Sequence, residues 1–178
     1  TESNLSCEEI LCQLRRYLPE DIGIYSCKEA APRFHARLNA KTKTYRYRIW
    51  NSDMPCVFDR RYLWQLPDKL DLDKMEEAAQ LFLGEHDFSA FCANKKMKKS
   101  TLRRIDALKI TQAGCEITIT VTGNGFLYNM VRILTGTLLS VAEGKIAVED
   151  IDKITEGKDR RMAGITVPAH GLYLNKVV

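Results

Sequence analysis

The clearest pattern in the chain is a change of hydrophobic period between residues 115 and 142. Apolar and polar residues alternate strictly over residues 115–122, which predicts a half-buried β-strand. Across residues 123–125 (Gly-Asn-Gly) the period changes from two to about 3.6. Apolar residues then recur at helical spacing, at Phe126, Met130, Ile133, Leu134, Leu138 and Val141. Gly144 is a helix stop, so the sequence predicts a strand, a glycine turn and a core helix in succession.

Arg132 is the one charged residue in this apolar helix. A helix that is apolar on nearly all sides is either a central core helix or a membrane span. Asn129, Thr135 and Ser140 make a poor membrane segment, so a core helix is the better interpretation. A buried charge without a partner costs several kcal/mol. Arg132 therefore either reaches water or meets a carboxylate or phosphate, and a structural ion pair and a functional arginine both remain open.

A second unusual segment covers residues 41–50, where aromatic and cationic side chains occur on both faces of an expected strand. One face holds Lys41, Lys43, Tyr45, Tyr47 and Ile49, and the other holds Thr42, Thr44, Arg46, Arg48 and Trp50. Neither set is plainly apolar. Such a strand suits a cleft wall that stacks on bases and neutralises phosphates. An amphipathic strand with packed tyrosines and solvated arginines explains the pattern as well.

The remaining elements are short and follow one another closely. Ser6 and Glu9 form a capping-box signature for a helix that ends near residue 18. Strands are expected at residues 22–27, 62–66, 105–111 and 171–178, with a hairpin turn at residues 113–114. A second helix is capped near Asp71 and ends by Gly84, and a short acidic helix covers residues 148–155. The core stripe of the second helix is Met75, Ala78, Ala79 and Phe82.

Two polar clusters deserve separate interpretation. Residues 95–104 hold six cations and no acid, at a loop expected to lie at a sheet edge. This run either binds a polyanion or forms a solvated face. Glu85, His86 and Asp87 resemble an acid–base or metal cluster, but consecutive residues point in different directions. Helix capping or turn formation is therefore the favoured use of this second cluster.

Composition narrows the class of protein. The chain has 178 residues, of which 45% are hydrophobic and 28% charged, as in one ordinary globular domain. A net charge of +4 permits a nucleic-acid partner without requiring one. Six cysteines without a CxxC pair and only three histidines argue against a structural zinc site and for reduced thiols in a cytoplasm. We therefore expect no metal.

Four segments stand in the same order as the motifs of the bacterial tRNA pseudouridine synthase A family, which the chain resembles throughout. They are FHARLNAKTKTYRYRIWN, GEHDFSAF, GNGFLYNMVRILTGTLL and PAHGLYL. The resemblance implies an antiparallel-rich mixed β-sheet with helices packed on it, in agreement with the α+β class expected from the pattern. It also implies a cofactor-free isomerisation of uridine to pseudouridine in the tRNA anticodon stem-loop, by a cytoplasmic homodimer.

The resemblance assigns roles to particular residues. Tyr45 matches the family tyrosine that stacks on the target base, and Arg132 matches the arginine that pairs with the nucleophilic aspartate. An aromatic ring and a guanidinium suit the holding of a flipped base and the aiming of a carboxylate. The cations expected to bind RNA are Arg37, Lys43, Arg46, Lys95, Lys96, Lys98, Lys99 and Arg103.

One motif of the family is missing. No string close to GRTDxGVHA, which holds the nucleophilic aspartate, occurs in these 178 residues. We therefore expect residues 1–178 to be a single domain, the C-terminal portion of a longer enzyme, and to be inactive alone. The main alternative is a non-catalytic RNA-binding module. A structural scaffold without RNA affinity is a third possibility.

Overall fold

The computed structural model describes residues 3–94 and 99–178 of the chain. It divides into two compact units, Thr1–Asn39 and Ala40–Val178. This division does not test the expectation of one domain over residues 1–178, because compactness does not show whether each unit folds independently. That expectation stays a prediction.

The first unit contains helix α1 (Cys7–Tyr17) and an irregular segment. The predicted capping box is confirmed, since the Ser6 hydroxyl accepts from the Glu9 N–H and the Glu9 carboxylate accepts from the Ser6 N–H. The predicted strand at residues 22–27 is wrong, because these residues are irregular. The Arg15 guanidinium donates to the carbonyls of Ile24 and Tyr25 at 3.0 and 3.2 Å, so a side chain occupies groups that strand pairing would use.

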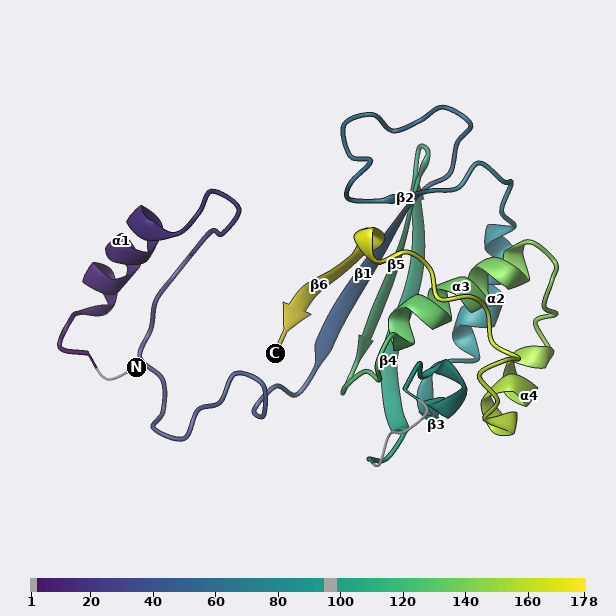
Figure 1. The fold of residues 1–178 in the computed structure, drawn as a ribbon. Coiled ribbons are helices and arrows are strands. Elements are labelled where there is room, and N and C mark those ends of the chain that lie inside the picture. Colours follow the sequence, from purple (N-terminus) through teal and green to yellow (C-terminus); the bar gives the residue numbers. More distant parts are fainter. Residues whose placement is uncertain (1–2, 95–98) are drawn as a thin grey trace. The chain divides into compact units, whose positions relative to one another are not determined.

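The second unit is built on a six-stranded sheet (Figure 1). The strands are β1 (Lys43–Trp50), β2 (Trp64–Gln65), β3 (Gly84–Asp87), β4 (Leu102–Ala113), β5 (Glu116–Gly123) and β6 (Leu172–Val177). Their order is β2-β1-β5-β4-β3, and β6 pairs with the first half of β1 on the edge whose second half pairs with β2. Only the β1–β2 pair is parallel among these pairs. The expected α+β fold with an antiparallel-rich mixed sheet is confirmed.

The central strands follow the sequence pattern. The β4–β5 hairpin turns at Gly114, whose φ of 59° lies in the left-handed region that glycine adopts easily. On β5, Ile117, Ile119 and Val121 are fully buried, while the intervening threonines are half-buried. The predicted alternation is therefore confirmed, and the apolar face of β5 is part of the hydrophobic core.

Strand β1 departs from the expectation that neither of its faces is plainly apolar. Tyr47 and Ile49 are fully buried, whereas Arg46 on the other face is exposed. Arg48 lies on that second face with its Nε 2.7 Å from Glu116 and its Nη2 3.0 Å from Asp59. The amphipathic interpretation thus accounts for the C-terminal half of β1, since one face of this half packs on the core and the other face is polar.

Helices α2 (Leu72–Gln80), α3 (Met130–Ala142) and α4 (Asp150–Gly157) lie on one side of the sheet (Figure 1). Nearly all of α3 is buried, which confirms it as a core helix. Asp71 caps α2 by accepting from the Lys74 N–H, and the predicted core stripe of α2 is buried. Within residues 3–94 and 99–178, no helix is long and apolar enough to cross a membrane.

Strand β4 is longer than the expected strand at residues 105–111, α4 lies two residues further on than expected, and three other elements differ more from the sequence pattern. The expected strand at residues 62–66 is reduced to β2, and the expected polar loop after residue 84 contains β3 and a 3₁₀ helix, η1 (Phe88–Phe91). Helix α3 begins at Met130, although apolar spacing starts at Phe126. The reason lies at Asn129, whose φ of 61° is left-handed and cannot continue a right-handed helix toward the N-terminus.

Helix α3 is in direct backbone contact with residues 164–168. A Cβ atom at Gly136 would overlap the carbonyl oxygen of Ile165, and one at Gly164 would overlap the backbone of Gly136. The N–H of Gly164 also donates to the Thr137 hydroxyl at 2.9 Å. Two glycines therefore allow this segment to lie against the helix at a distance that side chains would prevent.

We expect Gly136→Ala to destabilise the protein by roughly 1–3 kcal/mol, because the added methyl group must displace the backbone of residues 164–168. This outcome opposes helix propensity, which favours alanine over glycine. Gly157→Ala is the matched control, since a Cβ there meets nothing within 4 Å. Thermal melts of both variants test the prediction, and equal melting temperatures for both would contradict the proposed contact.

Asp87 links β3, η1 and α4. Its carboxylate accepts from the Ser89 N–H at 3.0 Å and lies 2.8 Å from the Lys158 ammonium group. Burial alone would raise the pKa of Asp87, but hydrogen bonds from Lys158, Thr101 and Ser89 outweigh it and lower the pKa to about 2. Asp87 thus acts as a helix cap, and the capping interpretation is confirmed for this residue.

We expect Asp87→Asn to lower the free energy of unfolding at pH 7 by about 1–2 kcal/mol. A lowered pKa contributes stability above the unfolded-state pKa, and this contribution is lost as the pH falls through about 2. The difference between Asp87→Asn and the parent protein should therefore vanish near pH 2. Urea titrations at pH 7 and pH 2 measure it, with Asp106→Asn, which breaks an exposed ion pair with Arg104, as the control. A constant difference at both pH values would contradict the ion-pair account.

Candidate functional site

Arg132 lies in the first turn of α3 and is half-buried. Its Nε donates to the carbonyl oxygen of Val167 at 2.6 Å, and its Nη1 donates to the side-chain oxygen of Asn129 at 3.2 Å. Both acceptors are neutral. In the part of the chain that the structure describes, no carboxylate lies within ion-pair distance of Arg132. The guanidinium is therefore fixed in direction while its charge remains uncompensated.

Asn129 holds the other side of this guanidinium. Its backbone is left-handed, and its side chain accepts from Arg132 instead of capping α3. Among residues with a side chain, asparagine is one that tolerates this conformation, whereas a β-branched residue would be strained. The Asn129 side chain therefore orients Arg132 and does not cap α3.

Tyr45 and Phe126 form an aromatic pair beside this turn. Their ring centroids are 5.1 Å apart, and the ring planes meet at 85°. Both side chains are half-buried against the core. In an edge-to-face pair the ring that presents its edge keeps its faces outside the contact. A ring face that stays open in such a pair is a surface on which a planar ligand can stack.

Tyr47 ties the same strand to the segment that holds Arg132. Its hydroxyl donates to the carbonyl oxygen of Pro168 at 2.7 Å. Burial raises the pKa of Tyr47 well above its usual range, and the nearby charge of Arg132 lowers it to a lesser extent. Tyr47 is therefore a neutral hydrogen-bond donor. The successive carbonyls of Val167 and Pro168 are thus held by Arg132 and Tyr47.

The predicted RNA-binding cations fall into separate places. Lys43 and Arg103 line one cavity of about 340 Å³, together with Phe126. Arg46 lies on the opposite face of β1 and lines a different cavity, also of about 340 Å³, with Arg48. The structure thus brings two of the predicted cations to the aromatic pair and places Arg46 away from it.

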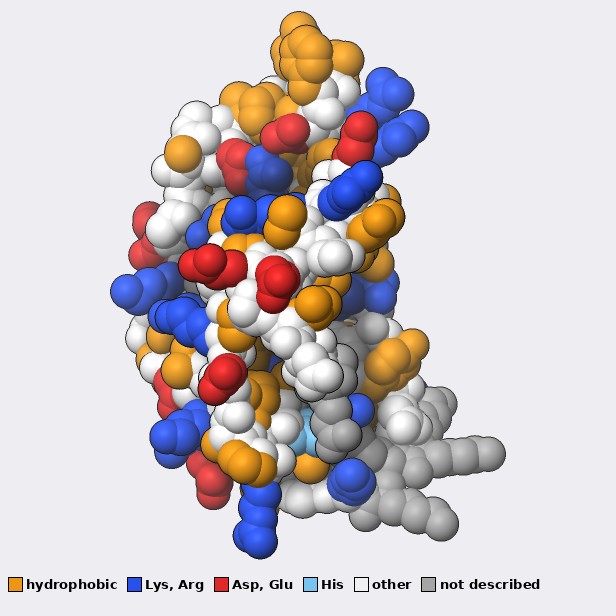
Figure 2. Space-filling view, turned by 90° about the vertical axis from the view of Figure 1, so that its left-hand side faces the viewer, with side chains coloured by type: hydrophobic (Ala, Val, Ile, Leu, Met, Phe, Trp, Pro, Cys, Tyr) orange, Lys and Arg blue, Asp and Glu red, His pale blue; other side chains and the backbone are white. Residues whose placement is uncertain are grey.

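The other predicted cations are Arg37, Lys95, Lys96, Lys98 and Lys99. Arg37 lies in the unit Thr1–Asn39. Its side chain is exposed, and its backbone N–H donates to the Nδ1 atom of His35. Lys99 is exposed. Lys95, Lys96 and Lys98 lie outside the described residues. Among the described side chains in Figure 2, Lys and Arg are interspersed with Asp and Glu, so positive charge is not gathered into one patch on that face.

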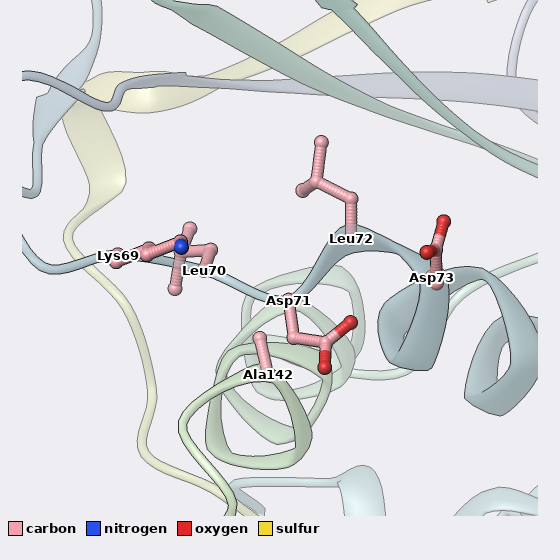
Figure 3. Close-up of a pocket in the computed structure, with 6 residues that line it drawn as sticks. All are labelled: Lys69, Leu70, Asp71, Leu72, Asp73 and Ala142. Carbon is pink, nitrogen blue, oxygen red and sulfur yellow. The ribbon is translucent and has the colours of Figure 1, made fainter.

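A cavity of about 460 Å³ lies where α2 begins and α3 ends, lined in part by Lys69, Asp71 and Asp73 (Figure 3). Its polar groups have structural uses. Asp71 caps α2 and lies 3.4 Å from the Lys74 ammonium group, and Asp73 belongs to the first turn of α2, where an acid is favourable. This cavity is therefore a less suitable functional site than the surroundings of Arg132.

The acid–base interpretation of residues 85–87 receives no support from their geometry. The ring of His86 bonds to the carbonyl of Leu83 at 2.7 Å, and Asp87 caps η1. Over residues 3–94 and 99–178, no group of three His, Cys, Asp or Glu side chains could hold a metal ion.

Sequence reasoning missed three parts of the site: Phe126, Asn129 and the carbonyl of Val167. Phe126 fitted the helical spacing and was assigned to the helix core. The useful signal was the asparagine immediately before the helix, because asparagine at such a position favours a left-handed turn. No side-chain pattern could reveal the Val167 carbonyl, because every residue has one.

Comparison with known proteins gives consistent results. A profile of the family described as tRNA pseudouridine synthase matches residues 78–178. The chain is 44% identical over 165 residues to tRNA pseudouridine synthase A of Bacillus licheniformis, covering 93% of this chain and 67% of that protein. It is 45% identical to the synthase of Bacillus sp. strain KSM-64 (98% and 71% covered) and 42% identical to that of Acetivibrio thermocellus (99% and 72% covered). The chain therefore belongs to the tRNA pseudouridine synthase family.

Proposed function

We propose that this chain forms the base-binding and carboxylate-positioning part of an enzyme that isomerises uridine to pseudouridine in tRNA. The observation that carries the proposal is the uncompensated guanidinium of Arg132, which is oriented by two neutral acceptors. An arginine held in this way favours a carboxylate that approaches it. The names of the relatives, all tRNA pseudouridine synthases A, support the same reaction.

The reaction needs both a nucleophile and groups that position the base. The bond between C1′ of the ribose and N1 of uracil breaks, the base turns, and a bond forms between C1′ and C5. The proton on C5 is lost and N1 gains a proton, so the change is redox-neutral. Tyr45 would stack on one face of the flipped base, and Phe126 would support the Tyr45 ring through their edge-to-face contact. Arg132 would keep the catalytic aspartate ionised, since an opposite charge nearby lowers a carboxylate pKa.

The nucleophilic aspartate would come from residues outside these 178, because no string close to GRTDxGVHA occurs among them. We use "intact enzyme" for a protein that contains both this chain and that motif. The proposal includes phosphate contacts by Arg37, Lys43, Arg46, Lys95, Lys96, Lys98, Lys99 and Arg103. It also includes the anticodon stem-loop as the modified region, a homodimeric intact enzyme and a cytoplasmic location.

The 178-residue chain alone should form no pseudouridine, because groups that stack and position cannot replace a nucleophile. The measurement is an assay for pseudouridine after incubation with unmodified tRNA, with the intact enzyme as the positive control. Turnover by the chain alone would place the reactive carboxylate among these residues and overturn this part of the proposal.

In the intact enzyme, Arg132→Met should lower kcat by roughly 100-fold or more while tRNA still binds. The substitution removes the group that orients the catalytic aspartate but leaves the tRNA-binding surface unchanged. Single-turnover rates and a separate binding assay distinguish the two effects. The variant also leaves the Val167 carbonyl without its donor, so some loss of stability is expected in addition.

Arg160→Met is the matched control for that structural loss. Arg160 is half-buried and donates to the carbonyls of Ala163 and Gly164 and to the Thr166 hydroxyl, on the same segment that Arg132 holds. It should lower the melting temperature but retain most of the turnover. If both variants reduce turnover equally, Arg132 is a structural residue and the assignment of the active site fails.

A further inference from the structure

Three strands end around the cavity that Lys43 and Arg103 share. Lys43 opens β1 and is paired with Gly123 at the end of β5, while Ile105 near the start of β4 is paired with the same glycine. The cavity of about 340 Å³ is lined by Lys43, Leu102, Arg103, Asn124, Gly125 and Phe126. Phe126 is also the partner of Tyr45. The cavity therefore adjoins the aromatic pair through one shared ring.

The charge of this cavity is positive and uncompensated. None of the six described residues that line it is acidic. Within the described part of the chain, neither Lys43 nor Arg103 takes part in an ion pair. Among the described residues, the acceptors of the Arg103 guanidinium are the carbonyls of Ser100 and Leu102, and both accept from Nη1. Its Nε and Nη2 therefore keep donors for a ligand.

Two of the acids at this end of the sheet are paired elsewhere, and the third, Glu85, lies opposite Arg104 in the β3–β4 pair, whereas Arg103 lies opposite His86. Asp106, on the same strand as Arg103, lies 2.7 Å from Arg104. Asp87, on the neighbouring strand β3, lies 2.8 Å from Lys158. Neither carboxylate is therefore available to neutralise Lys43 or Arg103, and an anion that enters the cavity meets two cations with their charge intact.

The backbone of the turn after β5 adds further donors. The N–H of Asn124 donates to Arg104, but the N–H groups of Gly125 and Phe126 have no acceptor among the described residues. A Cβ at Gly125 would stand 3.6 Å from the Cδ and Nε of Arg103. The side chain of Arg103 therefore lies directly beside the backbone of this turn.

We propose that this cavity is a phosphate subsite that binds the phosphodiester of a nucleotide adjacent to the target uridine. The inference rests on the proposed function, because it places the substrate base at Tyr45 and Phe126. Two unpaired cations with free backbone N–H groups form a setting that phosphate oxygens prefer. Holding the neighbouring phosphate would fix the backbone from which the base is flipped, and would do so without reading sequence.

The test uses the intact enzyme and a stem-loop RNA that contains the target uridine. Lys43→Gln and Arg103→Gln should each reduce the slope of log K against log salt by about 0.7, and weaken binding roughly fivefold at 0.1 M salt. Lys109→Gln is the control, since Lys109 is exposed on β4 and lines neither this cavity nor the aromatic pair. Lys109→Gln should leave both the salt slope and the affinity for the RNA unchanged.

The same RNA is then made with single methylphosphonates, which remove the charge of one phosphate at a time. One substitution next to the target uridine should weaken binding by the parent enzyme more than Lys43→Gln alone does, because it removes the partner of both cations. The same substitution should have a much smaller effect on the double variant Lys43→Gln/Arg103→Gln. If the double variant remains as sensitive as the parent enzyme at every flanking phosphate, the subsite does not exist. Failure of the proposed function is distinguishable, because the parent enzyme would then form no pseudouridine in this RNA.

Discussion

The backbone contact between α3 and residues 164–168 is the constraint on which the candidate site depends. Gly136 and Gly164 permit the close approach, and the Thr137 hydroxyl fixes it by accepting from the Gly164 N–H. A few residues further on, the same segment presents the carbonyls that orient Arg132 and Tyr47. A fault in the packing of two glycines would therefore be transmitted directly to the direction of the guanidinium.

This arrangement explains how a half-buried arginine can remain without a carboxylate. Full burial would make an unpaired charge very costly, and an exposed charge would lose its direction. Arg132 avoids both, because neutral oxygens satisfy two of its donors while part of the side chain stays accessible. In the proposed function this charge pairs with a carboxylate. The orientation of Arg132 requires a left-handed backbone at Asn129.

Much of the fold could be predicted from sequence, because burial imposes a period on each element. The alternation that gave β5 and the capping residues Ser6 and Asp71 are local signals, and all three were confirmed. The strand expected at residues 22–27 failed because strand formation needs a partner, which a local pattern does not specify. For the site, sequence and family resemblance indicated Tyr45 and Arg132, and their roles remain predictions. The carbonyl groups that orient Arg132 and Tyr47 could not be predicted from the sequence, because their positions depend on tertiary contacts alone.

Strand β1 shows how one element serves both the core and the site. Near its C-terminal end, Tyr47 and Ile49 are fully buried and Arg48 is neutralised by Glu116 and Asp59. Near its N-terminal end, Tyr45 is only half-buried and Lys43 has no ion-pair partner among the described residues. The C-terminal end of the strand is therefore fixed by packing and ion pairs, whereas the side chains at its N-terminal end keep groups that can bind a ligand. Rigid anchoring of that kind is what a site needs when its catalytic contribution is the accurate positioning of a base and a carboxylate.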